Sequence, residues 1–174
     1  MPDDIDIRPI VTHEEMRAVE DVQRAAWNMQ ERDVVPMHLM VTWVDYGGVL
    51  LGAFDGEALL GFVLGYPGLL DADDRRAAWS GARVQHCSEM LAVRPEAQST
   101  GIGFRLKVAQ RRLLLERGFA LATWTFDPLL SRNAHLNITR LGGICRSYKP
   151  NLYGELHGIY AGLPNDRLEA ERSL

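Results

Sequence analysis

The chain has 174 residues and a formal net charge of −4, so its length suits one domain and its charge argues against a nucleic-acid-binding protein. It contains no apolar run of 18 residues, and its start, MPDDIDIRP, has neither a basic segment nor an apolar core. Cys87 and Cys145 form no disulfide framework, and the five histidines lack metal-ligand spacing. We therefore expect one cytoplasmic domain over residues 1–174, with reduced thiols, no metal, no membrane span and no signal peptide.

The first half of the chain alternates strand and helix signals. A short strand over residues 6–10 is followed by a helix that Thr12 caps, because Glu15 three residues on completes a capping box. A second short helix is expected from about Met37. The Asp55-Gly56 pair then predicts a hairpin between strands 49–54 and 58–66.

Residues 67–83 form a polar connection with three acids, Asp71, Asp73 and Asp74. Two interpretations stay open for them: attraction of an amine substrate, or a solvated loop.

The central strand is predicted over Val84–Val93. Strict alternation places one set of side chains on one face, namely Cys87, Glu89, Leu91 and Val93. It places His86, Ser88 and Met90 on the other.

A glycine turn and a helix follow this strand. Pro95 ends the strand, the turn reads QSTGIG from Gln98 to Gly103, and Gly118 ends the helix. A strand, a glycine turn and a helix N-terminus together favour an anion, because the first helical N–H groups are free to bind it. The helix is also basic, with five cations against one acid, which either attracts a phosphate-rich cofactor or marks an exposed face. These cations are Arg105, Lys107, Arg111, Arg112 and Arg117.

Three phosphate-binding patterns compete for this turn. A P-loop needs a lysine directly after the last glycine, and Phe104 stands there. A dinucleotide fingerprint needs a third glycine where Leu106 stands. The Q-x-x-G-x-G pattern after a V-x-P strand end instead resembles motif A of the GNAT (GCN5-related N-acetyltransferase) superfamily. An ordinary β-turn-α corner remains the structural alternative.

The resemblance extends over the second half of the chain. After a strand over 119–126, the helix over 131–141 carries Asn133, Leu141 and Gly142, which resemble the N-x-x-A…L-G segment of that superfamily. Closing strands are expected over 144–148 and 155–160, with a last strand within 163–174. The implied fold is α/β: a mixed, mostly antiparallel sheet with helices on both faces and a splayed central strand pair.

The resemblance also implies a cofactor, acetyl-CoA or another acyl-CoA. The turn would hold its pyrophosphate, and the end of the central strand would pair with its pantetheine amides. The implied cofactor residues are Leu91, Ala92, Val93, Gln98, Ser99, Thr100, Gly101, Ile102, Gly103, Phe104 and Asn133. In this superfamily the region of residues 28–48 usually lines the acceptor site, although a core-covering loop is an equal interpretation.

Acyl transfer to an amine requires a group that removes a proton from the amine. We choose Glu89, four residues before Val93, because similar proteins place a carboxylate near this point and because burial would raise its pKa. A structural Glu89, paired with a cation across the sheet, is the alternative. His86 is the second candidate, but alternation puts it on the opposite face.

The proton donor departs from the family pattern. Ile138 stands where many GNAT enzymes carry a tyrosine, so Tyr148, Tyr153 or water would have to substitute. Two functions therefore remain: an N-acyltransferase that acts on a small amine of unknown identity, or a CoA-binding regulatory or scaffolding protein without catalysis. Either is compatible with a homodimer.

Overall fold

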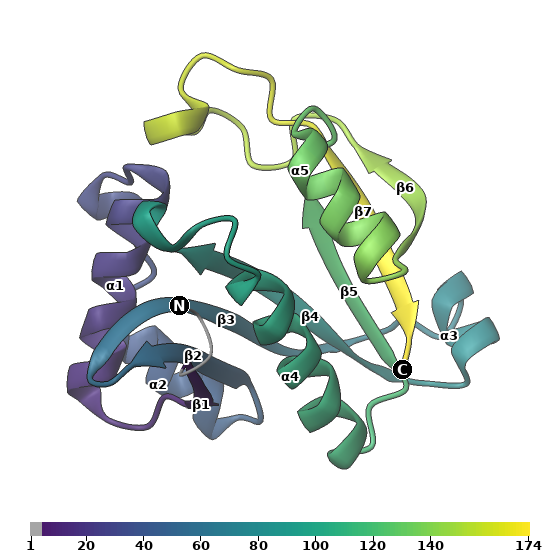
Figure 1. Ribbon diagram of the computed structural model, residues 1–174. Helices are drawn as coiled ribbons and strands as arrows, with labels where there is room; N and C mark the ends of the chain where they lie inside the picture. Colours follow the sequence, from purple (N-terminus) through teal and green to yellow (C-terminus); the bar gives the residue numbers. More distant parts are fainter. Residues whose placement is uncertain (1–4) are drawn as a thin grey trace.

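The computed structural model describes residues 5–174 and shows a seven-stranded sheet with helices on both faces (Figure 1). The strand order is β1-β2-β3-β4-β5-β7-β6, and every neighbouring pair is antiparallel except β4 and β5. The strands are β1 (Asp6–Pro9), β2 (Val49–Asp55), β3 (Ala58–Leu69), β4 (Val84–Val93), β5 (Leu121–Phe126), β6 (Ile144–Lys149) and β7 (Arg167–Ser173). This architecture confirms the predicted fold class. Residues 1–4, which the single-domain prediction included, lie outside the described residues.

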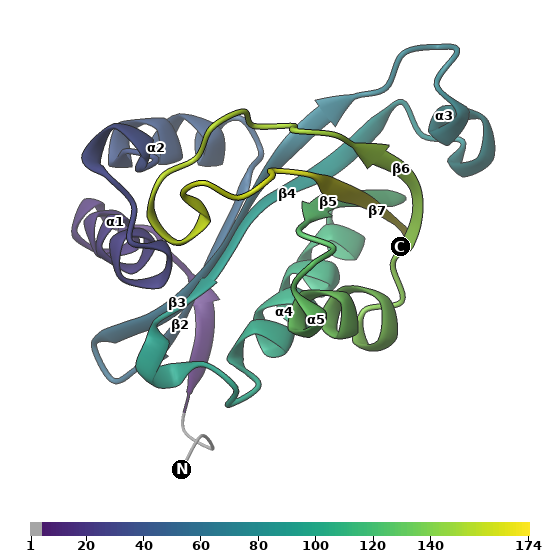
Figure 2. The same ribbon diagram turned by 90° about the horizontal axis from the view of Figure 1, so that it is seen from above.

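The helices lie in two layers (Figure 2). On one face of the sheet are α1 (His13–Trp27) and α2 (Met37–Asp45), and on the other are α4 (Ile102–Glu116) and α5 (Ser131–Ala134). The remaining helical segments are α3 (Arg75–Ser80), the π-helix η4 (His135–Arg140), which continues α5, and the 3₁₀ segments η2 (Glu31–Asp33), η3 (Pro95–Ala97) and η5 (Gly158–Tyr160). Within residues 5–174, no helix is both long enough and apolar enough to cross a membrane.

Local signals explain where the first helix begins. The Thr12 side chain accepts a hydrogen bond from the backbone N of Glu15 at 3.1 Å, and the Glu15 carboxylate accepts one from the backbone N of Thr12 at 3.2 Å. This reciprocal pair is the predicted capping box, which satisfies two N–H groups that the helix itself leaves free.

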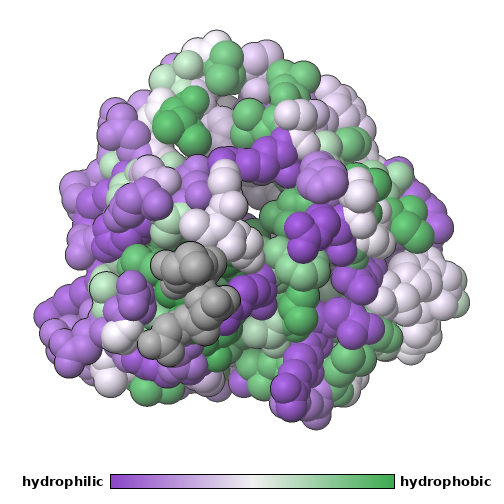
Figure 3. All heavy atoms as spheres, in the orientation of Figure 1, coloured by the Kyte–Doolittle hydropathy of each residue, from purple (hydrophilic) through white to green (hydrophobic). Residues whose placement is uncertain are grey.

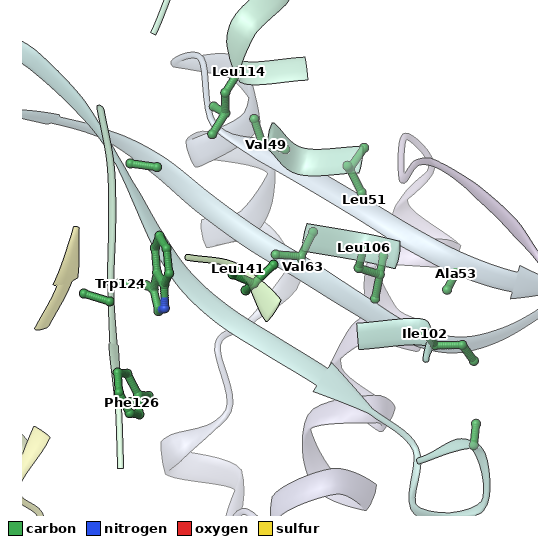
Figure 4. Packing of buried hydrophobic residues seen from close by; sticks show 13 residues of the cluster. Val49, Leu51, Ala53, Val63, Ile102, Leu106, Leu114, Trp124, Phe126 and Leu141 are labelled. Carbon is green, nitrogen blue, oxygen red and sulfur yellow. The ribbon is translucent and has the colours of Figure 1, made fainter. Parts of the chain in front are cut away.

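Two apolar cores hold the layers together. Between the sheet and α4, the side chains of Leu106, Val63 and Trp124 pack with those of Ile102 and Leu114 (Figure 4). Between the sheet and α1 and α2, a second cluster is built from Met16, Val19, Val22, Met40, Phe62 and Leu64. Because both faces of β2 and β3 are covered, these strands are almost continuously apolar.

The central strands β4 and β5 separate after a short contact. They pair only through His86 with Ala122 and Cys87 with Thr123. Beyond these residues β4 stays paired with β3 and β5 with β7, so the facing edges of the two strands diverge. The structure therefore confirms the predicted splayed pair.

A β-bulge in the β3–β4 ladder corrects the predicted alternation along β4. Gly65 pairs with Ser88 while Leu64 pairs with Met90, so Glu89 is an extra residue. The extra residue shifts the phase: Leu91 joins the α4-side core, whereas Met90 joins the α1-side core. Glu89 and Leu91 consequently do not share a face, contrary to the prediction from strict alternation.

Two segments between strands also differ from the prediction. Residues 155–160 form no strand; they are a loop with η5, held against the end of α1, where a Cβ at Gly158 would lie 2.2 Å from the carbonyl oxygen of Trp27. The polar connection after β3 contains α3, which Asp74 caps. Asp71, Asp73 and Asp74 do not border the large cavity described below.

We expect Gly65→Ala to destabilise the fold. A Cβ at this position would lie 2.3 Å from His86 Nε2 and 2.5 Å from the carbonyl oxygen of Cys87. Overpacking of this kind costs about 1–3 kcal/mol. Urea unfolding measures the loss, and Gly103→Ala is the control, because a Cβ there meets only ordinary contacts at 3.7 Å or more. Equal stability of the two variants would contradict this account of the bulge.

Candidate active site

A cavity of about 660 Å³ follows the gap between β4 and β5. It extends from the turn before α4 to the loop of residues 150–166. Figure 3 shows that the corresponding face of the molecule is hollowed near its centre, among both hydrophilic and hydrophobic side chains. Of the site residues predicted from the sequence, all but Thr100 border it. The bordering ones are Glu89, Leu91, Ala92, Val93, Gln98, Ser99, Gly101, Ile102, Gly103, Phe104 and Asn133.

The turn before α4 is built to expose backbone N–H groups. Gly101 is the N-cap residue with φ of +90°, and Ser99 also has a positive φ of +65°. The Gln98 side chain donates to the carbonyl of Val93 at 3.1 Å, and the Thr100 hydroxyl donates to the carbonyl of Ala97 at 2.7 Å. No side chain of the described residues caps α4, so its first N–H groups remain available to an anion.

One cation beside this turn comes from η4, a segment distant in the sequence. The Arg140 guanidinium lies 4.0 Å from the ring centre of Phe104, in the first turn of α4, and Arg132 also borders the cavity. Of the five cations predicted on the basic helix, only Lys107 borders the cavity, while Arg117 donates to the carbonyls of residues 47 and 48. Sequence reasoning missed Arg140, because the fold of η4 back onto α4 has no local signal.

The edge of β4 between the turn and Glu89 has no neighbouring strand. Residues 90–93 pair with β3 on one side only, since the last β4–β5 pair is at Cys87. The cavity lies along the free side. Free strand edges of this type bind extended chains through their backbone amides, which is the contact expected for a pantetheine arm.

Glu89 lies at the bulge, where it borders the cavity but is exposed. Its carboxylate accepts a hydrogen bond of 3.3 Å from the hydroxyl of Tyr66, whose ring stacks on Trp43 with centroids 4.9 Å apart. Burial raises the pKa of Tyr66 to about 12, and the charge of Glu89 adds to the rise. The expectation of a buried Glu89 is therefore wrong: the bulge turns the carboxylate outward, toward the α1–α2 side of the sheet.

Ile138 and the two tyrosines considered as its substitutes lie in different surroundings. Ile138 is exposed and borders no part of the cavity, and Tyr148 lies outside it, hydrogen-bonded to the carboxylate of Asp166. Tyr153 borders the cavity, with its hydroxyl 3.0 Å from the hydroxyl of Thr125. Burial raises the pKa of Tyr153, so its phenol stays protonated near neutral pH.

Lys107 is a buried cation at the point where β4 and β5 separate. Its ammonium donates to Ser88 Oγ at 2.8 Å and to Gln110 Oε1 at 3.1 Å, and it lies 4.4 Å from the ring centre of Trp124. Loss of hydration lowers the pKa of Lys107 to about 7, with a smaller contribution from Arg172. A lysine on the buried face of a helix is the sequence signal that was available for this residue.

His86, the second candidate for the base, is not in the cavity. It is fully buried on the α4 side, 3.1 Å from the Gln110 side chain, and burial lowers its pKa to about 3.

The two cysteines are free thiols. Burial raises the pKa of both, and neither borders the cavity. Among the residues that the structure describes, no cluster of histidine, cysteine, aspartate and glutamate is arranged to hold a metal ion.

The fold has many relatives among solved structures, although neither a scan of protein-family models nor a search of curated proteins finds a match. Arabidopsis thaliana NAA60, solved with a bisubstrate analogue, is 17% identical, covers 97% of each chain and has a TM-score of 0.72. The ribosomal-protein-S18-alanine N-acetyltransferase of Escherichia coli is 14% identical, with 97% of this chain and 93% of the other covered and a TM-score of 0.71.

A third structure, a GNAT family acetyltransferase from Elizabethkingia anophelis with acetyl-CoA bound, covers 99% of each chain at 16% identity and a TM-score of 0.68. At these identities the likeness concerns the fold. The chain has the fold of the GNAT acetyltransferases, as its turn and strand pattern suggested.

We expect Gly101→Val to weaken acetyl-CoA binding by about 10-fold or more, because a β-branched residue cannot hold a φ of +90° and the turn must reorganise. Calorimetry measures the affinity. Gly118→Val is the matched control: Gly118 has a φ of +77° at the other end of α4 and borders no part of the cavity. Both variants should lose stability, and equal acetyl-CoA affinities would exclude the turn as the binding site.

We expect Lys107→Met to raise the free energy of unfolding at pH 7 by about 1–3 kcal/mol, because it removes a buried charge while Ser88 still donates to Gln110. The pKa of Lys107 is lower in the folded than in the unfolded protein. The destabilising effect is therefore complete below pH 7 and fades as pH rises toward the ordinary lysine pKa. Urea titrations of both proteins from pH 7 to 10 should converge, and a constant difference would contradict the burial of an ammonium.

Proposed function

We propose that the protein transfers an acyl group from acetyl-CoA, or another acyl-CoA, to an amine. One observation carries the proposal: a single cavity joins the uncapped N-terminus of α4, the unpaired edge of β4 and the carboxylate of Glu89. The neighbours with this fold support it, since the Elizabethkingia anophelis protein has acetyl-CoA bound and the E. coli protein is an N-acetyltransferase.

The residues of the cavity suit an acyl-CoA. The N–H groups of the turn, from Ser99 to Phe104, would bind the pyrophosphate, with Arg140 beside them. The backbone of residues 91–93 would pair with the pantetheine amides, which places the thioester near the point where the strands separate. Acetyl-CoA supplies the acyl group and a thiolate leaving group when it is bound.

Glu89 is our candidate for the base. Its carboxylate is exposed to the cavity, and Tyr66 holds it on the α1–α2 side of the sheet. In the transfer a bond forms between the amine nitrogen and the acyl carbon, the C–S bond breaks, Glu89 accepts the amine proton and the thiolate gains one. Tyr153 and Lys107 are two cavity groups that carry a proton near neutral pH and could donate it to the thiolate.

Direct transfer is the mechanism we favour. An acyl-enzyme on a cysteine would need a thiolate, and burial raises the pKa of both Cys87 and Cys145.

A CoA-binding regulatory or scaffolding protein is the second candidate. It is favoured by the α5–η4 segment, where the cavity is bordered by His135, Leu136 and Asn137 and not by a tyrosine. Such a protein would bind CoA through the same turn and strand edge but would release no thiol with any amine.

The first test is thiol release from acetyl-CoA across an amine panel, with Glu89→Gln beside the wild type. We expect kcat/KM to fall by about 10²–10⁴-fold, the usual weight of general acid–base catalysis. Acetyl-CoA affinity should be unchanged, because Glu89 lies on β4, four residues before Val93, and not in the turn proposed to bind the pyrophosphate.

Glu57→Gln, in the exposed β2–β3 turn, is the control and should behave as wild type. Full activity in Glu89→Gln would make Glu89 a structural residue. No release with any amine would favour the CoA-binding regulator.

A further inference from the structure

Arg167 is a buried cation that forms no salt bridge with a carboxylate of residues 5–174, although its charge helps to lower the pKa of Asp166. It begins β7, is 6% exposed and borders the cavity. Within residues 5–174 its guanidinium forms one hydrogen bond, from Nη1 to the backbone carbonyl of Asp166 at 2.9 Å. A guanidinium has five N–H donors, so most of its capacity remains unused.

Two tyrosine rings hold the guanidinium without neutralising it. Its central carbon lies 5.6 Å from the ring centre of Tyr153 and 5.2 Å from that of Tyr160. Burial raises the pKa of both tyrosines, so both are neutral rings at physiological pH. Cation–π contacts stabilise a charge only partly, and burying an unpaired cation is costly.

The protein pairs its other buried charges on this sheet differently. Glu171 lies four residues further along β7, and its carboxylate accepts hydrogen bonds from the guanidinium groups of both Arg75 and Arg146. Asp127 also borders the cavity, but its carboxylate accepts from the backbone N of Leu129 at 2.8 Å. The unused donors of Arg167 are therefore available to a ligand in the cavity.

Arg167 and Glu89 lie on the same side of the sheet. Thr125, which pairs with Glu169 of β7, has its hydroxyl against Tyr153 on the face opposite the α4-side core. Tyr153 is also within electrostatic range of both Glu89 and Arg167. An acceptor with its amine at Glu89 would thus extend toward the guanidinium.

The loop of residues 150–166 borders this side of the cavity. It arches from the β6–β7 end toward α1, as both ribbon views show (Figures 1 and 2). His157 contacts Asp33 at 3.1 Å and Arg32 at 2.6 Å, and Gly158 lies against the carbonyls of Trp27 and Asn28. Because this loop packs against the end of α1 beside the cavity, the acceptor side suits a small molecule better than a polypeptide.

We propose that Arg167 binds an anionic group of the acceptor, and that the acceptor is a small amine carrying a carboxylate, such as a free amino acid. The substrate class rests on the proposed function. The fork of N–H donors fits a carboxylate in a bidentate manner, and the ligand charge would supply the counter-ion that the fold leaves out.

The test compares matched ligands on the full chain in the presence of CoA. Calorimetry with amino acids, their decarboxylated amines, their amides and the corresponding aminophosphonates asks which group is bound. We expect amino acids to bind about 10–100-fold more tightly than the amines, the usual effect of a charge-assisted hydrogen bond. Thiol release with the same panel then asks whether bound ligands are acylated.

Three variants assign the effect to the side chain. Arg167→Met should abolish the preference for the carboxylate, Arg167→Lys should keep part of it, and Arg112→Met, a change on the exposed face of α4, should keep all of it. The ligand comparison on the wild type remains decisive even if Arg167→Met fails to fold.

Each result decides one point. Equal binding of amino acids and amines, a preference retained in Arg167→Met, or no binding of any amino acid overturns the proposal. Tighter binding of aminophosphonates than of amino acids would overturn the assignment of a carboxylate, but it would support an anionic group at Arg167. Acylation of peptides that does not depend on a carboxylate would overturn the assignment of a small acceptor. Amino-acid binding without acylation supports the role of Arg167 and contradicts the proposed transferase.

Discussion

The separation of β4 from β5 is the constraint on which the rest of the site depends. Two residue pairs join the strands, and beyond Cys87 the edge of β4 has backbone groups without a neighbouring strand. Buried backbone groups need partners, so an opened sheet is stable only where something else can satisfy them. The cavity therefore follows from sheet topology: the sheet opens where a ligand with amide groups would complete it.

The bulge and the splay act together on the carboxylate of Glu89. The extra residue in the ladder turns Glu89 toward the α1–α2 side, while Leu91 keeps its place in the core against α4. Gly65 permits this local geometry because its lack of a side chain leaves room for the His86 ring. The same distortion that breaks the alternation thus presents a charged group to the cavity without burying it.

The cations of the cavity are divided between the two sides of the sheet. Lys107 lies on the α4 side, hydrogen-bonded to Ser88 and Gln110, and Arg167 lies on the other side between two tyrosines. Neither forms an ion pair with a carboxylate of the described residues, although the fold pairs Glu171 twice. Two unpaired buried cations in one cavity lower the stability of the folded protein, and such an arrangement is typical of functional sites.

Local chemistry in the sequence determined much of the fold. The capping box at Thr12, the Asp55-Gly56 hairpin and the glycine turn before α4 are short-range patterns, and each forms its structure through contacts between near neighbours. The glycine turn with the strand end before it, together with the Asn133 to Gly142 segment, led to the GNAT resemblance and to the predicted residues of the turn and of β4. Only the tertiary structure decided the bulge at Glu89, the course of residues 155–160 along α1, and the approach of Arg140 and Arg167 to the cavity. These features depend on contacts between segments far apart in the chain. The local sequence does not indicate such partners, because they meet only when the layers pack.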